Sequence, residues 1–389
     1  MEDLILKKKL VKIMTSQRTI LGAGPMSLNS INAVDFVSKK NKVPIFLICS
    51  RRQIDSKFHG GGYVNNWSTE DLSHYLKKKK NNNVILCRDH GGPWQNNKEI
   101  KKKLNLKQAM ISAKKSFEDD IDNDFKIIHI DPSLNIDGKN SLERVIDLIM
   151  ELYQHCYEYA LKKKKKILFE IGTEEQTGFS DNFIELENLI DKITKKLLKK
   201  KLPKPVFMVA QTGTRVLENK NIGSLDFPDQ RLINELPAEI TIPKVSKMFE
   251  RYGIYIKQHN SDYLSAETLK WLPRLGIHAI NVAPEFGYIE SLEYSKLLKE
   301  LKLKKHLDTF YEISYNSKKW VKWMSEKESS DEFKSLLCGH YIYSDEKFLE
   351  SKNEVKEILK KRKINLDYIL ESKIREKLSE YIKSLNFFS

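Results

Sequence analysis

Short apolar segments rich in β-branched residues recur along the first three-quarters of the sequence, and they constrain the fold most. Stretches rich in Lys, Glu and Leu with helical spacing separate them, such as 141–159 and 183–198. Short apolar runs of this kind are typical of parallel strands buried on both faces. The expected strands span 19–23, 43–49, 84–88, 126–130, 167–171, 206–210, 254–257 and 279–282. Strands alternating with helices over about 285 residues predict a closed (β/α)8 barrel of the TIM type.

The alternative arrangement is an open, doubly wound sheet. No GxGxxG fingerprint follows the first expected strand, and 22–25 (Gly-Ala-Gly-Pro) suits a tight turn. From about Leu303 the strand signals fade and helical segments continue to the end, with Trp320 and Trp323 three residues apart on one face. We therefore expect a barrel over 1–302 and a helical extension over 303–389 that packs on the barrel or on a partner subunit.

The composition excludes several classes of protein. The formal net charge of +15, from 68 Lys and Arg against 53 Asp and Glu, could indicate a nucleic-acid partner. However, the basic residues are mostly Lys in homopolymer runs without interleaved aromatics, and Arg is scarce, so we expect no nucleic-acid binding. No apolar run reaches the ~20 residues of a membrane span. The N-terminus lacks a signal-peptide pattern and the cysteines are far apart, so we expect a cytoplasmic protein with reduced thiols and no membrane partner.

Unusual polar residues follow each expected strand after the first. In a barrel, the carboxyl ends of the strands are where catalytic groups converge. The Lys runs 77–80, 162–166 and 199–201 mostly precede strands, so we expect them at the opposite end of the barrel. The segments expected at the catalytic end are 50–55, 60–63, 89–94, 131–133, 172–175, 211–215, 259–263 and 281–285.

His90 and His259 are the natural pair of metal ligands at these strand ends. Neutral imidazoles suit a divalent transition metal, Glu174 or Glu170 could complete the set, and Gln211 could add a carbonyl oxygen. Each residue alone could instead be a hydrogen-bonded core residue. A slip of one residue reverses the direction of a side chain, so the sequence does not decide which of Glu170, Glu174 and Glu175 faces the site.

Asp89 and Glu174 are the candidates for proton transfer. Asp89 could be an acid or base that moves a hydroxyl proton, or it could orient His90. Glu174 is the second candidate for proton transfer. His129, inside the fourth expected strand, could point into the barrel or into the helix layer, and we expect a structural role for it. No Ser-His-Asp arrangement with a nucleophile elbow is present, so hydrolase chemistry has little support.

Arg residues at or just after strand ends suggest that the substrate is anionic, since Arg is otherwise rare here and suits phosphates and carboxylates. The glycines at 60–62 either let backbone amides approach a phosphate or form a flexible loop. The residues expected to bind substrate are Arg51, Arg52, Gln53, Gly61, Gly62, Arg88, Asp131, Ser133, Arg215, Asn260, Ser261, Asp262 and Asn281.

Several motifs together resemble one known family. The motifs are Gly-Gly-Gly-Tyr at 60–63, Asp-His-Gly-Gly-Pro at 89–93, His-Ile-Asp-Pro-Ser at 129–133, Ile-Gly-Thr-Glu at 171–174, Gln-Thr-Gly at 211–213 and His-Asn-Ser-Asp-Tyr at 259–263. The chain is similar in them to the non-catalytic subunit of class II D-tagatose-1,6-bisphosphate aldolase. The likeness covers nearly the whole chain and includes Trp320 and the stretch His-Tyr-Ile-Tyr-Ser-Asp at 340–345.

This resemblance implies a barrel of the class II aldolase type with a divalent metal, zinc first and nickel, manganese or cobalt as alternatives. By the likeness, His90 and His259 are ligands and Asp89 handles the hydroxyl proton. Gln211 stands where the aldolases have a His, as in the accessory family, which weakens the case for simple aldolase activity. Relatives reported as 4-epimerases of ketohexoses, their phosphates or sugar acids provide a catalytic interpretation.

Two functions therefore follow as expectations. The favoured one is a metal-dependent enzyme of carbohydrate metabolism, an epimerase or aldolase-like lyase that acts on a small anionic sugar by aldol and retro-aldol chemistry, with inversion at C4. The alternative is a non-catalytic subunit that stabilises a separate tagatose-bisphosphate aldolase; a homo-oligomer is the other possible assembly. The charged segment 51–55 departs from the family and favours a more acidic substrate, such as a sugar acid, a bisphosphate or a nucleotide-linked sugar.

Overall fold

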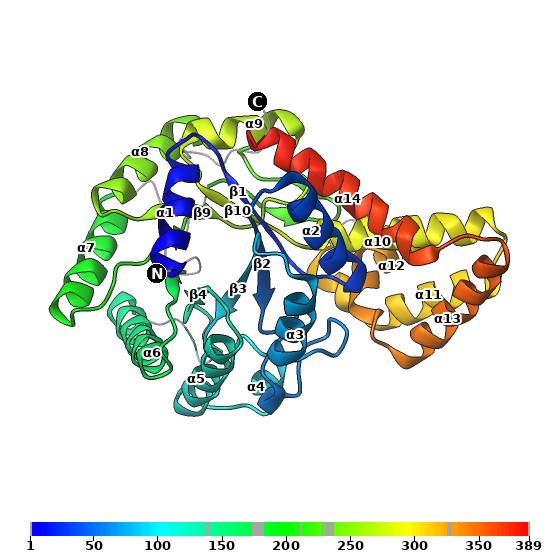
Figure 1. Ribbon diagram of the computed structural model, residues 1–389, viewed down its shortest axis with the longest axis horizontal. Coiled ribbons are helices and arrows are strands. Elements are labelled where there is room, and N and C mark those ends of the chain that lie inside the picture. The colour runs from blue at the N-terminus through cyan, green and yellow to red at the C-terminus, as the bar shows by residue number, and fades with distance from the viewer. Residues whose placement is uncertain are drawn as a thin grey trace.

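Eight parallel strands close into a barrel in the part of the chain that the structure describes (Figure 1). The structure is a computed structural model, and it describes residues 2–136, 138, 141–172, 183–210, 212–227, 229, 237–324 and 329–387. Around the barrel the strands follow the order β1, β10, β9, β6, β5, β4, β3, β2. They are β1 (Ile20–Ala23), β2 (Ile45–Ser50), β3 (Val84–Gly91), β4 (Ile127–Ile130), β5 (Leu168–Ile171), β6 (Phe207–Val209), β9 (Tyr255–Gln258) and β10 (Ala279–Val282). The predicted (β/α)8 barrel is confirmed.

Helices surround this barrel, and a short antiparallel hairpin, β7 (Val216–Leu217) with β8 (Lys220–Asn221), follows β6. Several helices begin where a Ser or Asn caps the first turn: Ser27 accepts from the backbone N–H of Ser30, and Ser68 from that of Asp71. The helices of the barrel are α1 (Glu2–Met14), α2 (Leu28–Asn41), α3 (Thr69–Lys79), α4 (Asn97–Lys101), α5 (Leu106–Asp122), α6 (Leu142–Lys162), α7 (Phe183–Lys199), α8 (Ala238–Arg251), α9 (Ala266–Leu275) and α10 (Pro284–Glu300).

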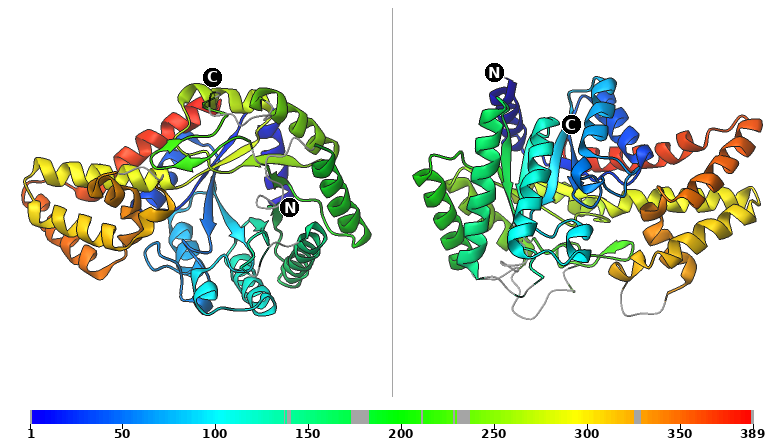
Figure 2. Two further views of the ribbon diagram at one scale, coloured as in Figure 1. Left: turned by 180° about the vertical axis from the view of Figure 1, so that it is seen from behind. Right: turned by 90° about the horizontal axis from the view of Figure 1, so that it is seen from below.

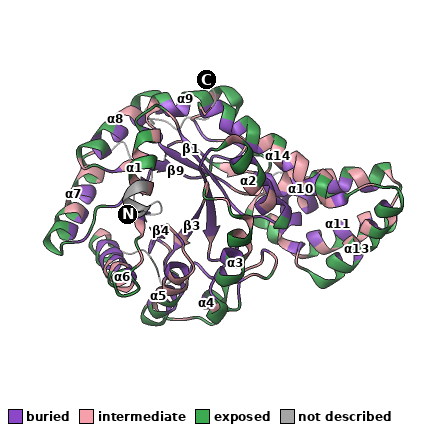
Figure 3. Cartoon of the chain, in the orientation of Figure 1, coloured by how far each residue is buried: buried purple, intermediate pink, exposed green. Residues whose placement is uncertain are grey.

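The apolar core has two parts around the strands. The larger part fills the space between the strands and the outer helices, whose outward faces are exposed (Figure 3). The smaller part lies where the strands begin, and there Leu10 and Met14 of α1 pack against Ile20, Phe46 and Val206. Helix α1 therefore covers the amino end of the barrel and leaves the carboxyl end for a site.

The predicted helical extension is present beyond α10. It contains α11 (Lys304–Asn316), α12 (Asp331–Cys338), α13 (Glu346–Lys361) and α14 (Leu366–Ser384), with short 3-10 turns η3 (Lys319–Lys322) and η4 (Gly339–Ile342). In Figure 2 these helices project from one side of the barrel, while α14 runs back towards it. Ile374, Leu378 and Tyr381 of α14 join the core of the barrel, whereas Phe310 and Phe348 build a second core in the extension. The boundary at 302 and 303 stays a prediction.

Three further expectations concern the whole chain. The Lys runs lie in the last turns of α3, α6 and α7 or just beyond them, and therefore near the amino ends of the strands that follow. All four cysteines are free and buried. In the described ranges, no helix combines the length and the apolar character needed to cross a bilayer.

Candidate active site at the carboxyl end of the barrel

A cavity of about 320 Å³ opens at the carboxyl ends of the strands. Its walls come from two parts of the chain. The barrel contributes Asp89, His90 and His259, and the extension contributes Lys322, Trp323, His340 and Tyr341. The sequence analysis placed the polar strand ends here but found none of these residues of the extension as site residues, because their approach depends on how α10 and η4 fold back.

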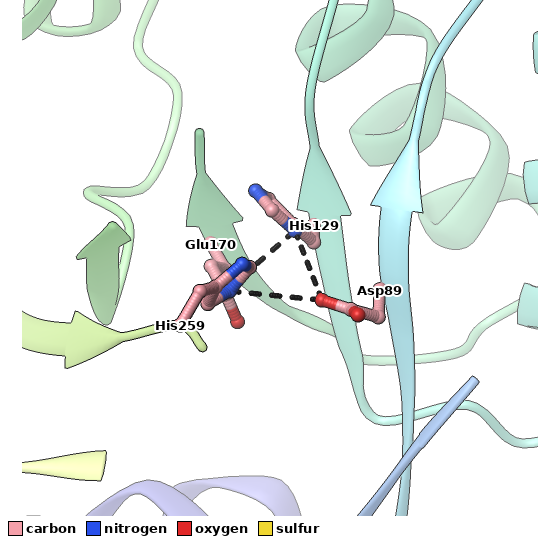
Figure 4. Close-up of side chains that lie close together, drawn as sticks. All are labelled: Asp89, His129, Glu170 and His259. Carbon is pink, nitrogen blue, oxygen red and sulfur yellow. Dashed lines mark hydrogen bonds and ion pairs between the residues drawn. The ribbon is translucent and has the colours of Figure 1, made fainter. Parts of the chain in front are cut away.

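Asp89, His129, Glu170 and His259 converge beside this cavity (Figure 4). One ligand atom from each lies within 4.8 Å of the other three, and all four residues are buried. His129 Nδ1 lies 3.5 Å from Asp89 Oδ1 and 3.7 Å from Glu170 Oε1. His259 Nε2 lies 3.7 Å from Asp89 Oδ1 and 3.4 Å from Glu170 Oε1.

These distances match a four-coordinate metal site. Metal–ligand bonds of about 2.1 Å in a tetrahedron separate neighbouring ligand atoms by about 3.4 Å. Two imidazoles and two carboxylates are also a donor set that divalent transition metals accept. His129 Nδ1 in addition accepts a hydrogen bond from the backbone N–H of His90 at 3.1 Å, so this ring would exchange that bond for a metal. The residues present fit a divalent cation.

Lys257 completes the electrostatics of the cluster. Its ammonium is fully buried and donates to Glu170 Oε2 at 2.7 Å, which leaves Oε1 for the other cluster residues. Burial opposes ionisation of Glu170, but Lys257 and the two imidazoles outweigh it and lower its pKa to about 2. The sequence analysis missed Lys257; the only signal was a lysine inside an otherwise apolar strand.

His90 lies beside the cluster, with its ring centre 5.1 Å from that of His259 and 5.6 Å from that of His129. Its backbone has a φ of 43°, and its Nδ1 lies 2.8 Å from Asp131 Oδ2. Ser133 and Gln95 donate to Asp131 and hold it in place. Burial opposes the charge of His90, but Asp89 and Asp131 outweigh it and raise its pKa to about 9. Burial likewise opposes ionisation of Asp89, yet His90 and His259 hold its pKa well below the ordinary range.

The geometry therefore differs from the expected ligand set in two described residues. His129, for which we expected a structural role, points into the cluster, while His90 contacts Asp131. The left-handed turn at His90 breaks the alternation on which the sequence argument depended. Glu170 is the acidic residue of β5 that faces the cluster. Glu174, Glu175 and Gln211 lie outside the described residues, so their expected roles stay predictions.

The four expected anion-binding arginines divide into three groups. Arg51 is buried and paired with Asp55 and Glu99, and Arg88 is buried and paired with Asp120. These two do not clamp substrate in this arrangement, because buried carboxylates already neutralise them. Arg215 is exposed just before β7 and outside the cavity lining. Arg52 alone lines the cavity.

Most other expected substrate residues do reach a cavity. Gly61 and Gly62 line a second cavity next to the first. Ser261 is fully buried and its hydroxyl accepts from Gln258, so it does not line either one. Those that line the first cavity are Gln53, Asp131, Ser133, Asn260, Asp262 and Asn281.

Asp262 belongs to a buried carboxylate pair at the edge of the cavity. One of its oxygens accepts from the backbone N–H groups of Ala283 at 2.8 Å and Glu285 at 3.0 Å. The Glu285 carboxylate accepts a hydrogen bond from the hydroxyl of Tyr381 in α14. Burial, with the nearby charge of Glu285, raises the pKa of Asp262 to about 7.

This raised pKa predicts a pH-dependent stability. The folded chain keeps a proton on Asp262 that the unfolded chain releases near pH ~4. The free energy of unfolding should therefore fall as the pH rises from about 4 to 7, and D262N should lack this contribution. Urea denaturation of wild type and D262N at pH 5 and pH 8 checks it. The free energy of unfolding of the wild type minus that of D262N should be smaller at pH 8 than at pH 5. An equal difference at both pH values would contradict it.

His340 brings a neutral imidazole to the cavity from the extension. It is 1% exposed, and its Nδ1 has no hydrogen-bond partner in the described chain. Burial, with some contribution from Lys322, lowers its pKa to about 3. A buried polar atom without a partner is costly, and this nitrogen lies against Gly287.

Comparisons with known proteins give a likeness of fold. Protein-family models and curated proteins yield no match. A probable tagatose 6 phosphate kinase from Sinorhizobium meliloti 1021 superposes with a TM-score of 0.73 at 15% identity, over 94% of this chain and 100% of that one. A fructuronate-tagaturonate epimerase from Cohnella laeviribosi gives 0.58 at 12% identity, over 95% and 81%. A fructose-bisphosphate aldolase from Campylobacter jejuni gives 0.55 at 14% identity, over 98% and 94%.

Proposed function

We propose that the chain is a metal-dependent enzyme that makes and breaks a carbon–carbon bond of a ketose, a ketose phosphate or a related acidic sugar, and that it inverts C4. The observation that carries the proposal is the convergence of Asp89, His129, Glu170 and His259 beside the cavity, with neighbouring atoms 3.4–3.7 Å apart. A bound divalent cation would supply Lewis acidity for a carbonyl oxygen of the sugar.

Asp89 and His90 are the residues that would move protons, Asp89 through Oδ2, because Oδ1 is the oxygen that faces the histidines of the cluster. Asp89 lines the cavity and its Oδ1 accepts from the amide of Asn281 at 3.1 Å. His90 has its Nδ1 held by Asp131, which leaves Nε2, 3.9 Å from Asp89 Oδ2, to exchange a proton. An acceptor and a donor side by side are what reversible removal of a hydroxyl proton needs.

The proposed reaction then follows from the position of the hydroxyl. In a ketose with its carbonyl at C2, the C4 hydroxyl is β to that carbonyl. Asp89 takes the C4 hydroxyl proton, the C3–C4 bond breaks, and its electron pair passes to the C2–C3 enediolate, leaving an aldehyde at C4. The aldehyde fragment then rotates, and C3 attacks the opposite face of its carbonyl. The proton returns from Asp89 to the C4 oxygen. Atoms and charge balance, and C4 is inverted.

The names of the structural neighbours agree with sugar chemistry. One is called an epimerase of fructuronate and tagaturonate and another an aldolase of fructose bisphosphate. Asn281 lines the cavity, and its amide suits a hydroxyl of such a substrate.

A substrate panel tests the proposal. Chelator-treated protein is supplied with zinc, nickel, manganese or cobalt, and is offered ketohexoses, ketohexose phosphates and hexuronates, with products resolved by chromatography. We expect one class to give the 4-epimer only when a metal is added, and D89N to lose at least about a hundredfold in rate. Equal turnover by metal-free protein would contradict the proposal. No turnover, together with a gain in stability of a separate aldolase, would favour the accessory function.

A further inference from the structure

A second cavity, of about 690 Å³, lies next to the first and shares Arg52, Tyr63, Lys322 and Tyr341 with it. One wall is the segment after β2, with Gly60 and Gly61, and the facing wall is η3 of the extension. The shared residues make the two cavities neighbouring chambers of one space. A ligand with its reactive end beside Asp89 could therefore extend into the second chamber.

The second chamber has an excess of positive charge. No carboxylate side chain is among its lining residues in the described ranges. Arg51 is neutralised by Asp55 and Glu99, and the ammonium of Lys98 donates to the carbonyl of His59. Among the other lining cations, Arg52, Lys101, Lys318, Lys319 and Lys322 have no ion pair to a described residue.

Arg52 stands at the passage between the chambers. Its Nε is buried and has no hydrogen-bond partner in the described chain. Across the passage, Lys322 places its ammonium 4.3 Å from the ring centre of Trp323. Lys322 is exposed as a residue, yet desolvation of its ammonium, followed by the charges of Arg52 and Lys319, lowers its pKa to about 8. Like charges held close together repel each other, and a cleft lined by them attracts an anion.

The backbone of the glycine segment does not supply the anion site. The N–H groups of Gly60, Gly61 and Gly62 donate to the carbonyls of Lys57, Ser56 and Trp67. The suggestion that these amides cradle a phosphate does not hold in this arrangement. Recognition would come from the side chains of Arg52 and the lysines.

We propose that the second chamber binds a diphosphate group at the far end of the substrate. The inference rests on the proposed function, in which the sugar lies beside Asp89. A volume of about 690 Å³ exceeds the need of one phosphoryl group, and five unpaired cations exceed its charge. The substrate class is therefore a sugar with a diphosphate-bearing substituent, such as a nucleotide-linked sugar.

Calorimetric titration of chelator-treated full-length protein tests this, with inorganic pyrophosphate and inorganic phosphate as the probes. Removal of the metal prevents pyrophosphate from binding at the cluster. We expect pyrophosphate to bind at least tenfold more tightly than phosphate, and the affinity to fall as KCl is raised. Equal affinities for the two probes, or no binding of pyrophosphate, would overturn the inference.

Matched variants locate the binding. K319M/K322M changes two exposed lysines of η3 that have no ion pair to a described residue, and it should weaken pyrophosphate binding at least tenfold. K162M/K199M removes the same charge from exposed helix ends at the other end of the barrel and should stay within twofold of wild type. R52M should lose as much as the η3 pair. Equal weakening by the η3 pair and its control would overturn the proposed location.

D89N separates this inference from the proposed function. It should bind pyrophosphate as wild type does while it fails to convert any sugar. Binding of pyrophosphate without turnover by wild type would contradict the function and support the chamber. Metal-dependent turnover of sugars without binding of pyrophosphate would contradict the chamber and leave the function standing.

Discussion

Replacing His259 with alanine is expected to lower kcat/KM by at least about a thousandfold, because a metal Lewis acid contributes several kcal/mol and 1.4 kcal/mol is a factor of ten. His259 would be one of the metal ligands, and its Nε2 lies 3.7 Å from Asp89 Oδ1 and 3.4 Å from Glu170 Oε1. H259A should also lose bound metal. Elemental analysis of the purified protein and steady-state rates on the substrate found by the panel give both quantities.

His306 is the matched control for this experiment. It is a buried His bonded to Ser351 in the extension, away from the cluster. H306A should therefore keep the metal and most of the activity. Wild-type metal content and rate in H259A would show that the cluster does not bind the metal.

The second large effect concerns stability. R88M is expected to lower the free energy of unfolding by about 3–5 kcal/mol, the usual cost of leaving one partner of a buried ion pair without the other. Arg88 donates to both oxygens of Asp120 and to the carbonyls of Cys49 and Ile54. Urea denaturation measures the loss.

Two variants make this measurement decisive. R88M/D120N should regain part of the stability, since it removes the unpaired carboxylate as well. R52M should cost about 1 kcal/mol or less, because Arg52 has no described acidic partner to leave behind. Equal destabilisation by R88M and R52M would contradict the division of the arginines into structural and ligand-binding residues.

The barrel could be predicted because each strand is a separate apolar run. The segment 279–282 was predicted with the bounds that β10 has, and 126–130 differs from β4 by one residue. Local composition is enough to locate these strands. A strand buried on both faces is a continuous apolar run, which can be recognised without knowing what packs against it. The polar ends could be predicted for the same reason: parallel strands bring their carboxyl ends together.

The details of the site could not be predicted, because each depends on geometry that is not local. We expected His90 as a metal ligand and His129 as a structural residue. The positive φ of His90 directs its side chain towards Asp131, and His129 lies in the cluster instead. Arg51 and Arg88 become structural only when α4 and α5 bring Glu99 and Asp120 against them. His340 and Lys322 reach the cavity because the extension folds back towards the barrel. The hydrophobic periodicity of the sequence does not predict this packing.

Anomalous diffraction at the zinc absorption edge, from crystals soaked with one equivalent of zinc, tests the central claim most directly. We expect one strong peak among Asp89, His129, Glu170 and His259, with ligand atoms at about 2.0–2.2 Å. A peak on His90 that is out of reach of His129 and Glu170, or no peak at the cluster, would contradict it.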